Sequence, residues 1–207
     1  MTEQQANEYL LKWKFPVRHI ALKKSDLSDV KKSTFNILEK YVQDFKIEYN
    51  WNKLIAEGKS PHLQKGLYIC SSQFGTGKTS LAVYVVRELL KHDKLRYKSA
   101  FFGVSKLHDD IKESYGDRDN PNKPDYTDIK HRLLNSDILI LDDLGKERLT
   151  PSVVEKTFMY IDERYNSLRP TIFTSNYAIN QIDISGTGKT GEAFMNRIKE
   201  MVEVVEL

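Results

Sequence analysis

The sequence is poor in cysteine, and this scarcity excludes a disulfide-stabilised fold. Its single cysteine, Cys70, cannot form an intrachain disulfide, and a chain without disulfides fits a reducing compartment. No apolar run approaches the roughly 20 residues that a membrane-spanning helix needs. The N-terminal stretch M-T-E-Q-Q-A-N-E is polar and does not resemble a secretory signal. We therefore expect a cytoplasmic protein with no membrane partner.

The chain also lacks a strong excess of charge of either sign. It has 32 Lys and Arg residues against 29 Asp and Glu residues, a net charge of +3, and an isoelectric point of about 8.7. This mild basic excess permits contact with nucleic acid without implying it. With 207 residues, of which 40% are hydrophobic, the chain is large enough for one α/β domain with a sizeable core and a short appendage.

Short apolar runs alternate with helical patterns along the sequence. Four runs predict strands: G-L-Y-I-C-S-S (66–72), K-S-A-F-F-G-V (98–104), D-I-L-I-L-D-D (137–143) and P-T-I-F-T-S-N (170–176). Amphipathic patterns predict helices from about residue 33, over 80–91, over 105–117, from Thr150–Pro151 onward, and near 191–202. Near-continuous apolar strands separated by helices are typical of a parallel sheet that is covered on both faces.

The motif G-T-G-K-T occurs twice, at 75–79 and at 186–190. A phosphate loop must turn from the end of a strand directly into a helix, so that backbone N–H groups and the positive end of the helix dipole face the phosphates. The first copy has this setting, whereas the second follows a polar stretch and only 17 residues come after it. The full pattern begins with glycine, and here Ser72 and Asp183 occupy that position in the first and second copies. An aspartate would repel phosphate, so we interpret the second copy as a polar loop.

The first copy therefore predicts a nucleotide site. Lys78 is expected to reach the β- and γ-phosphates, and the hydroxyl of Thr79 is expected to bind Mg²⁺. Backbone N–H groups of the loop supply further donors. The predicted nucleotide-binding residues are Ser72, Gly75, Thr76, Gly77, Lys78, Thr79 and Ser80.

Polar side chains at the ends of two other predicted strands complete this site. Asp142 and Asp143 end the strand D-I-L-I-L-D-D, and ligands bind at this edge of parallel α/β sheets. Asp142 is expected to hold Mg²⁺ through water, and Asp143 to orient and deprotonate an attacking water. Asn176, at the end of another strand, is expected to hydrogen-bond the γ-phosphate or that water. Asp143 and Asn176 are thus predicted catalytic residues.

Three motifs together resemble a known family. S-Q-F-G-T-G-K-T-S, L-I-L-D-D-L-G-K-E and R-P-T-I-F-T-S-N are similar to the AAA+ module of bacterial and phage replicative helicase loaders of the DnaC/DnaI type, and to the related IstB transposition ATPase. The resemblance spans about residues 60–203. It implies an α/β P-loop NTPase fold (AAA+, ASCE type) over 61–207, with a five-stranded parallel sheet flanked by helices, ATP and Mg²⁺. Residues 1–60 are then an N-terminal segment with a helix, and a sensor 2 arginine is expected beyond the end of the chain.

The resemblance also implies partners. M-N-R-I-K matches the segment that carries the arginine finger, so Arg197 would reach the γ-phosphate of a neighbouring subunit in a homo-oligomer. F-P-V-R-H-I-A-L resembles the stretch that helps to enclose the adenine. The helical insert V-S-K-L-H-D-D-I-K-E-S-Y-G corresponds to the part that contacts single-stranded DNA, with Lys106, Lys112 and Tyr115 as candidate contacts among several acidic residues.

The leading hypothesis is an ATP-hydrolysing helicase loader that binds single-stranded DNA and a replicative DNA helicase, with slow hydrolysis that depends on assembly or DNA. The alternative is an IstB-like ATPase that remodels DNA for a transposase. A small-molecule phosphotransferase is disfavoured because the insert lacks the several arginines that a lid needs. An interaction module that nucleotide merely stabilises is a fourth reading.

Overall fold

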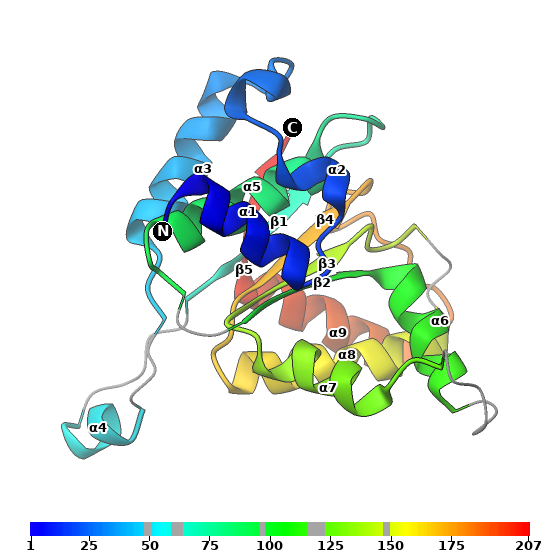
Figure 1. The fold of residues 1–207 in the computed structure, drawn as a ribbon. Helices are drawn as coiled ribbons and strands as arrows, with labels where there is room; N and C mark the ends of the chain where they lie inside the picture. The colour runs from blue at the N-terminus through cyan, green and yellow to red at the C-terminus, as the bar shows by residue number, and fades with distance from the viewer. Residues whose placement is uncertain (48–50, 59–63, 96–97, 116–122, 147–149) are drawn as a thin grey trace.

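The computed structural model describes the chain except residues 48–50, 59–63, 96–97, 116–122 and 147–149 (Figure 1). The described elements are α1 (Glu3–Lys12), α2 (Val17–Ile20), the short 3₁₀ helix η1 (Lys24–Leu27), α3 (Lys32–Asp44), α4 (Trp51–Ala56), β1 (Gly66–Cys70), α5 (Lys78–Lys91), β2 (Ser99–Gly103), α6 (Val104–Ser114), α7 (Tyr126–Asn135), β3 (Ile138–Asp142), α8 (Pro151–Asn166), β4 (Thr171–Ser175), α9 (Gly188–Met201) and β5 (Val202–Glu206).

The five strands form one sheet in the order β2-β3-β4-β1-β5, and every neighbouring pair is parallel. The prediction of a five-stranded parallel sheet is confirmed, and the four predicted strands are all present. The fifth strand, β5, was not located in the sequence. In the register of the sheet Cys70 lies beside Ser175, and Gly103 beside Asp142. The carboxyl ends of β1, β3 and β4 therefore meet at one edge.

Helices cover both faces of the sheet, as the apolar runs predict (Figure 1). Alternate residues of each strand point to opposite faces. Leu67 and Ile69 of β1 pack in a core with α1, α2, α3 and α5. Tyr68 and Cys70 pack in a second core with α6, α7, α8 and α9. Both faces of the strands are buried, which explains why their sequences show no alternation of apolar and polar residues.

The N-terminal segment forms part of one of these layers. Thr2 caps α1 and exchanges hydrogen bonds with Gln5 in a capping box. Leu10 of α1 and Leu38 of α3 are completely buried in the core that α5 shares with the sheet. Residues 1–45 therefore cover a face of the sheet directly.

A buried arginine makes hydrogen bonds within the helical layer on the other face of the sheet. The side chain of Arg164, in α8, has no exposed surface. Its Nε donates to the hydroxyl of Thr171 at 2.9 Å, its Nη1 to the carbonyl of Leu133 at 2.8 Å, and its Nη2 to the carbonyl of Pro170 at 2.6 Å. Burial lowers the pKa of Arg164 to about 9. This one side chain thus ties α8 to the end of α7 and to the start of β4.

Candidate nucleotide-binding site

The first G-T-G-K-T forms the predicted strand–loop–helix turn. β1 ends at Cys70 and α5 begins at Lys78. Gly75 and Gly77 have φ angles of +75° and +85°, which side-chain-bearing residues rarely adopt. Gly77 is the N-cap of α5, and no side chain caps this helix end. The first N–H groups of α5 therefore remain for an anion, as a phosphate site requires.

Lys78 lies folded across this loop. Its Nζ donates to the carbonyls of Gln73 at 2.9 Å and Ser71 at 3.3 Å, and approaches the hydroxyl of Thr76 at 3.4 Å. Only 7% of the residue is exposed. Burial lowers the pKa of Lys78, while the charge of Asp143 acts in the opposite direction. Neutral oxygens alone hold the ammonium group by hydrogen bonds, so its charge remains for a phosphate.

The two residues predicted to bind magnesium lie in contact. The hydroxyl of Thr79 donates to Oδ1 of Asp142 at 2.8 Å. The hydroxyl of Thr174, in β4, donates to the same oxygen at 2.6 Å. Burial raises the pKa of Asp142, although both hydroxyls oppose this shift. A partly buried carboxylate beside a hydroxyl is a donor set that Mg²⁺ prefers, and the ion would relieve the cost of removing that charge from water. These residues therefore fit a magnesium ion.

Asp143 has an unusual backbone conformation. Its φ is +62°, and its N–H donates to the hydroxyl of Thr174 at 2.9 Å. Its carboxylate pairs with Nζ of Lys146 at 3.2 Å. Thr174 thus holds both Asp142, the last residue of β3, and Asp143, which follows it, a role that was not predicted from the sequence. The sequence did contain a signal for this role of Thr174. T-S-N ends the predicted strand that neighbours the strand ending in D-D.

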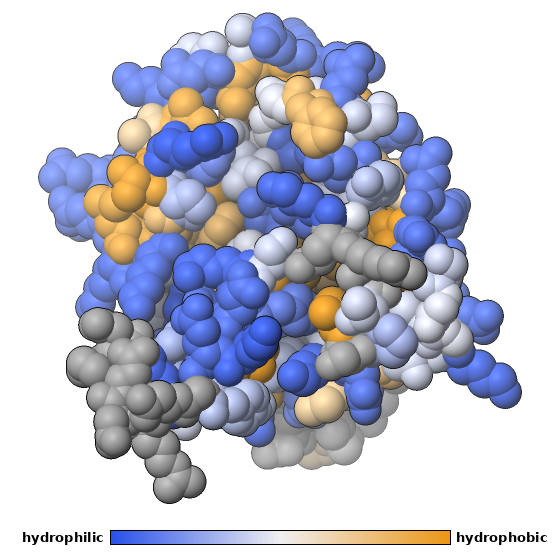
Figure 2. Space-filling view, turned by 90° about the vertical axis from the view of Figure 1, so that its right-hand side faces the viewer, coloured by the Kyte–Doolittle hydropathy of each residue, from blue (hydrophilic) through white to orange (hydrophobic). Residues whose placement is uncertain are grey.

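One cavity of about 250 Å³ brings most of the predicted residues together. It is lined by Arg18, His19, Phe74, Gly75, Thr76, Gly77, Lys78, Thr79, Ser80, Asp143, Lys146 and Asn176. Ser72 instead lines a neighbouring cavity of about 500 Å³ on the loop, together with Asp29 and Leu207. Phe74 and Lys146 were not assigned to the site from the sequence. Arg18 and His19 belong to F-P-V-R-H-I-A-L, which the resemblance places at the adenine, but neither residue was given a role of its own. The surface on the right-hand side of Figure 1 is largely hydrophilic, with apolar groups scattered over it (Figure 2).

The second G-T-G-K-T lies elsewhere in the fold. The sequence predicts a polar loop here, but only part of the motif is a loop. α9 begins inside it at Gly188, with Thr187 as N-cap. Gly186 and Gly188 have φ angles of +79° and +59°, which resemble those of the first copy. No strand leads into it, because β4 ends at Ser175. Lys189 is exposed. The motif here supplies the turn that starts a helix.

Arg197 is not among the residues that line the phosphate cavity. It lies in α9, where its Nε donates to Asp162 at 2.9 Å and its Nη1 to Glu200 at 2.8 Å. Its guanidinium also lies over the ring of Tyr165, 3.9 Å from the centroid. Its side chain remains 27% exposed. In this subunit the arginine therefore interacts with α8 and α9 rather than with the nucleotide site.

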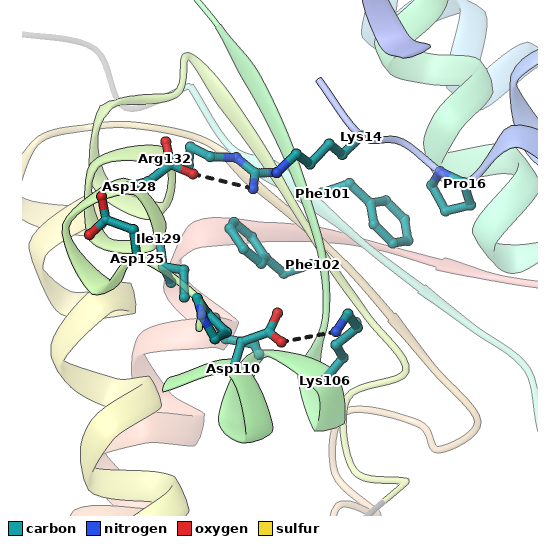
Figure 3. Close-up of a pocket in the computed structure, with 13 residues that line it drawn as sticks. Lys14, Pro16, Phe101, Phe102, Lys106, Asp110, Asp125, Asp128, Ile129 and Arg132 are labelled. Carbon is teal, nitrogen blue, oxygen red and sulfur yellow. Dashed lines mark hydrogen bonds and ion pairs between the residues drawn. The ribbon is translucent and has the colours of Figure 1, made fainter. Parts of the chain in front are cut away.

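The predicted DNA-contacting helix borders another cavity. This cavity of about 480 Å³ lies where β2 meets α6 and α7, and Phe101 and Phe102 line it from opposite faces of β2 (Figure 3). Lys106 pairs with Asp110 at 2.9 Å, and Arg132 lies near Asp128. Lys112 and Tyr115 are exposed. The predicted helix over 105–117 is present as α6 up to Ser114, and residues 116–122 lie outside the description.

Sequence comparison decides the family. The pattern of the family described as IstB-like ATP binding protein matches residues 67–207. The chain belongs to this family. The match begins in β1 and includes the phosphate loop, both acids of β3 and the end of β4, so this IstB-like chain is an ATP-binding protein. A comparison with curated proteins finds no match.

Solved structures agree with this assignment. The IstB-like chain is similar to DnaI, with 23% identity and a TM-score of 0.67 over 93% of this chain and 91% of that one. It is similar to the DnaC helicase loader, with 28% identity and a TM-score of 0.54 over 86% of this chain and 99% of that one. The replication initiator DnaA, bound to AMPPCP and single-stranded DNA, gives 15% identity and a TM-score of 0.59 over 87% of this chain and 49% of that one. The AAA+ P-loop fold is therefore confirmed.

No helix in the described parts of the chain is both long and apolar enough to cross a membrane. This finding concerns helices alone.

Proposed function

We propose that this protein is an ATP-hydrolysing helicase loader that binds single-stranded DNA and a replicative DNA helicase. One observation carries the proposal. The similarity to the DnaC helicase loader extends over 99% of that chain at 28% identity, so this chain has a counterpart for nearly all of that structure. DnaI, which is similar over 91% of its length, supports the same assignment.

The site supports ATP hydrolysis. Lys78 and the N–H groups of the phosphate loop bind the β- and γ-phosphates, and Thr79 with Asp142 holds Mg²⁺. The ion supplies charge that stabilises a phosphoryl transition state. Asp143 accepts the proton of the attacking water, which Asn176 orients. Both side chains line the same cavity as Lys78, which supports these roles.

A second subunit completes the site in this proposal. Arg197 lies outside the cavity of its own subunit and remains partly exposed. Arginine suits a transition-state contact because its planar fork stays charged and pairs with phosphate oxygens. Arg197 therefore reaches the γ-phosphate of a neighbour in a homo-oligomer. Because each site needs two subunits, isolated subunits hydrolyse ATP slowly.

Single-stranded DNA binds along α6 in this proposal. Lys112 and Tyr115 are exposed on the helix end, where they offer a phosphate contact and a stacking surface. Lys106 must first leave Asp110, its partner at 2.9 Å. We therefore assign Lys106 a weaker contribution than Lys112.

The test is a loading assay on circular single-stranded DNA with an annealed forked strand. Purified replicative helicase is added with the wild type, with Lys78→Ala or with no loader, and strand displacement is measured. ATP turnover of the wild type and of Lys78→Ala is measured in parallel reactions without the helicase, which itself hydrolyses ATP. We expect displacement and turnover with the wild type only. Full ATP turnover by Lys78→Ala would falsify the enzymatic assignment.

The family match keeps the transposition alternative open, since the matching family is that of IstB-like proteins. Immobilised wild type is therefore presented with purified replicative helicase and with purified transposase. Retention of the transposase and not of the helicase would favour the alternative and contradict the loader.

A further inference from the structure

The phosphate cavity contains a cation that the proposed chemistry does not use. Arg18, in α2, lines the cavity together with Lys78, Asp143 and Asn176. We infer that Arg18 binds the phosphate chain of the nucleotide in the same subunit, as a second cation beside Lys78. The inference rests on the ATP site of the proposed function, and it is independent of DNA and of the helicase.

The charges around the cavity support this role. Lys146 pairs with the carboxylate of Asp143 at 3.2 Å. Arg18 donates its Nε to the ring of His19 at 3.0 Å, and among the described residues no carboxylate pairs with it. Two of the Lys and Arg side chains that line the cavity, Lys78 and Arg18, therefore make no direct ion pair with a carboxylate of the described residues. A nucleotide polyphosphate is the anion of this site, and it would balance both.

Two contacts to α5, and one hydrogen bond within α2, hold Arg18 beside the phosphate loop. Because arginine only donates, Nε2 of His19 must accept from Arg18, and the proton of His19 then lies on Nδ1. Nδ1 lies 2.9 Å from the hydroxyl of Ser80, the residue that follows Thr79, and donates to it. Nη1 of the buried Arg87 donates to the carbonyl of Ile20 at 2.9 Å, which fixes the end of α2.

The remaining donors of Arg18 suit phosphate. With Nε bound to His19, both Nη nitrogens remain, and no hydrogen bond joins them to the described residues. Guanidinium N–H groups form paired, charge-assisted hydrogen bonds with phosphate oxygens. The contact would also link the N-terminal segment, which contains α2, to nucleotide binding.

The test compares Arg18→Gln with Lys12→Gln in the full chain. Lys12 is exposed in α1 and does not line the cavity, so this variant removes the same charge at a distance. Binding of fluorescent ATP and ADP analogues is titrated at one salt concentration, and melting temperatures without nucleotide check folding. We expect Arg18→Gln to bind about tenfold more weakly, a change of about 1.4 kcal/mol, and Lys12→Gln to bind as the wild type does.

Each result of the nucleotide titration either supports or contradicts the binding of phosphate by Arg18. A loss for both analogues supports contact with the α- or β-phosphate, and a loss for the ATP analogue alone supports contact with the γ-phosphate. Wild-type affinity of Arg18→Gln for both analogues would overturn the inference, as would an equal loss in Lys12→Gln. If Arg18→Gln melts at a lower temperature than the wild type, Arg18→Lys is measured as well. An Arg18→Lys variant that melts as the wild type does but still binds the analogues weakly would show that binding requires the guanidinium. Failure of helicase loading alone would leave the inference intact.

Discussion

The hydroxyl of Thr79 donates to the carboxylate of Asp142 across 2.8 Å, and this contact joins the phosphate loop to the end of β3. Two motifs that are remote in the sequence meet through it. Thr174 donates to the same oxygen, so the carboxylate is oriented before nucleotide arrives. Preorganisation of this kind lowers the cost of assembling a metal site.

The first prediction follows from the burial of that carboxylate. Asp142→Asn removes a partly buried charge but keeps an oxygen that accepts hydrogen bonds from both hydroxyls. We expect the nucleotide-free variant to melt at the wild-type temperature or higher, while the additional stabilisation by MgATP and ATP turnover are lost. Melting curves with and without MgATP test this. A variant that melts several degrees lower without nucleotide would contradict the structural argument.

The second prediction concerns the shared site. Lys78→Ala and Arg197→Ala should each reduce ATP turnover at least about 100-fold, since arginine fingers contribute this much or more. Mixed in equal amounts, the two inactive proteins should recover about a quarter of wild-type turnover, because a quarter of the head-to-tail contacts pair an intact loop with an intact finger. Lys199→Ala, on the same helix, is the matched control. Absence of recovery at every mixing ratio would exclude a finger supplied by a neighbour.

The third prediction concerns Arg164. Arg164→Met fits the buried volume but leaves the carbonyls of Leu133 and Pro170 without this donor. We expect a loss of about 3 kcal/mol in the free energy of unfolding, because unpaired buried polar groups are costly. Lys156→Met, at an exposed position of α8, should change stability by less than about 0.5 kcal/mol. Urea unfolding of both variants measures the difference, and equal stabilities would refute the role of Arg164.

The fourth prediction concerns His19. Burial and the nearby Arg18 lower the pKa of His19 below its usual 6.5, so the folded protein binds fewer protons at this ring than the unfolded chain. Stability must therefore rise with pH between the lowered pKa and 6.5, and fall as acid is added through that window. His19→Gln should remove this part of the pH dependence. Chemical unfolding from pH 7 to pH 5 tests it, and identical slopes in the two proteins would contradict it.

Most of the fold could be predicted because the signals are local. The strands β1 to β4 are continuous apolar runs bounded by polar residues. The helices between them carry an apolar stripe, except α5, which is buried on most sides. β5 escaped detection because α9 ends at Met201 and β5 begins at Val202, without a turn residue between them. The pattern V-E-V-V-E also resembles the end of an amphipathic helix. α1 was missed as well, although its capping box at Thr2 and Gln5 was a readable signal.

The site could be predicted where a motif fixes the residue, and not where only tertiary contact does. The spacing of G-T-G-K-T and the acids after a buried strand identified Lys78, Thr79 and Asp142. The resemblance brings the stretch F-P-V-R-H-I-A-L to the adenine, but it does not place Arg18 beside the phosphate loop, because this depends on how α2 packs against α5. The exact start of α9 was also missed, since two glycines are a poor helix-start signal.

The conformation of Asp143 restricts which acid can occupy its position. At a φ of +62° a short Asx side chain is tolerated far better than a longer one, because it hydrogen-bonds locally. Glutamate has the same charge but would add backbone strain, and its extra methylene group would move the carboxylate away from its place beside Lys146. The backbone geometry thus favours aspartate independently of the proton transfer that we propose for it, and a conservative exchange of carboxylates would not be silent here.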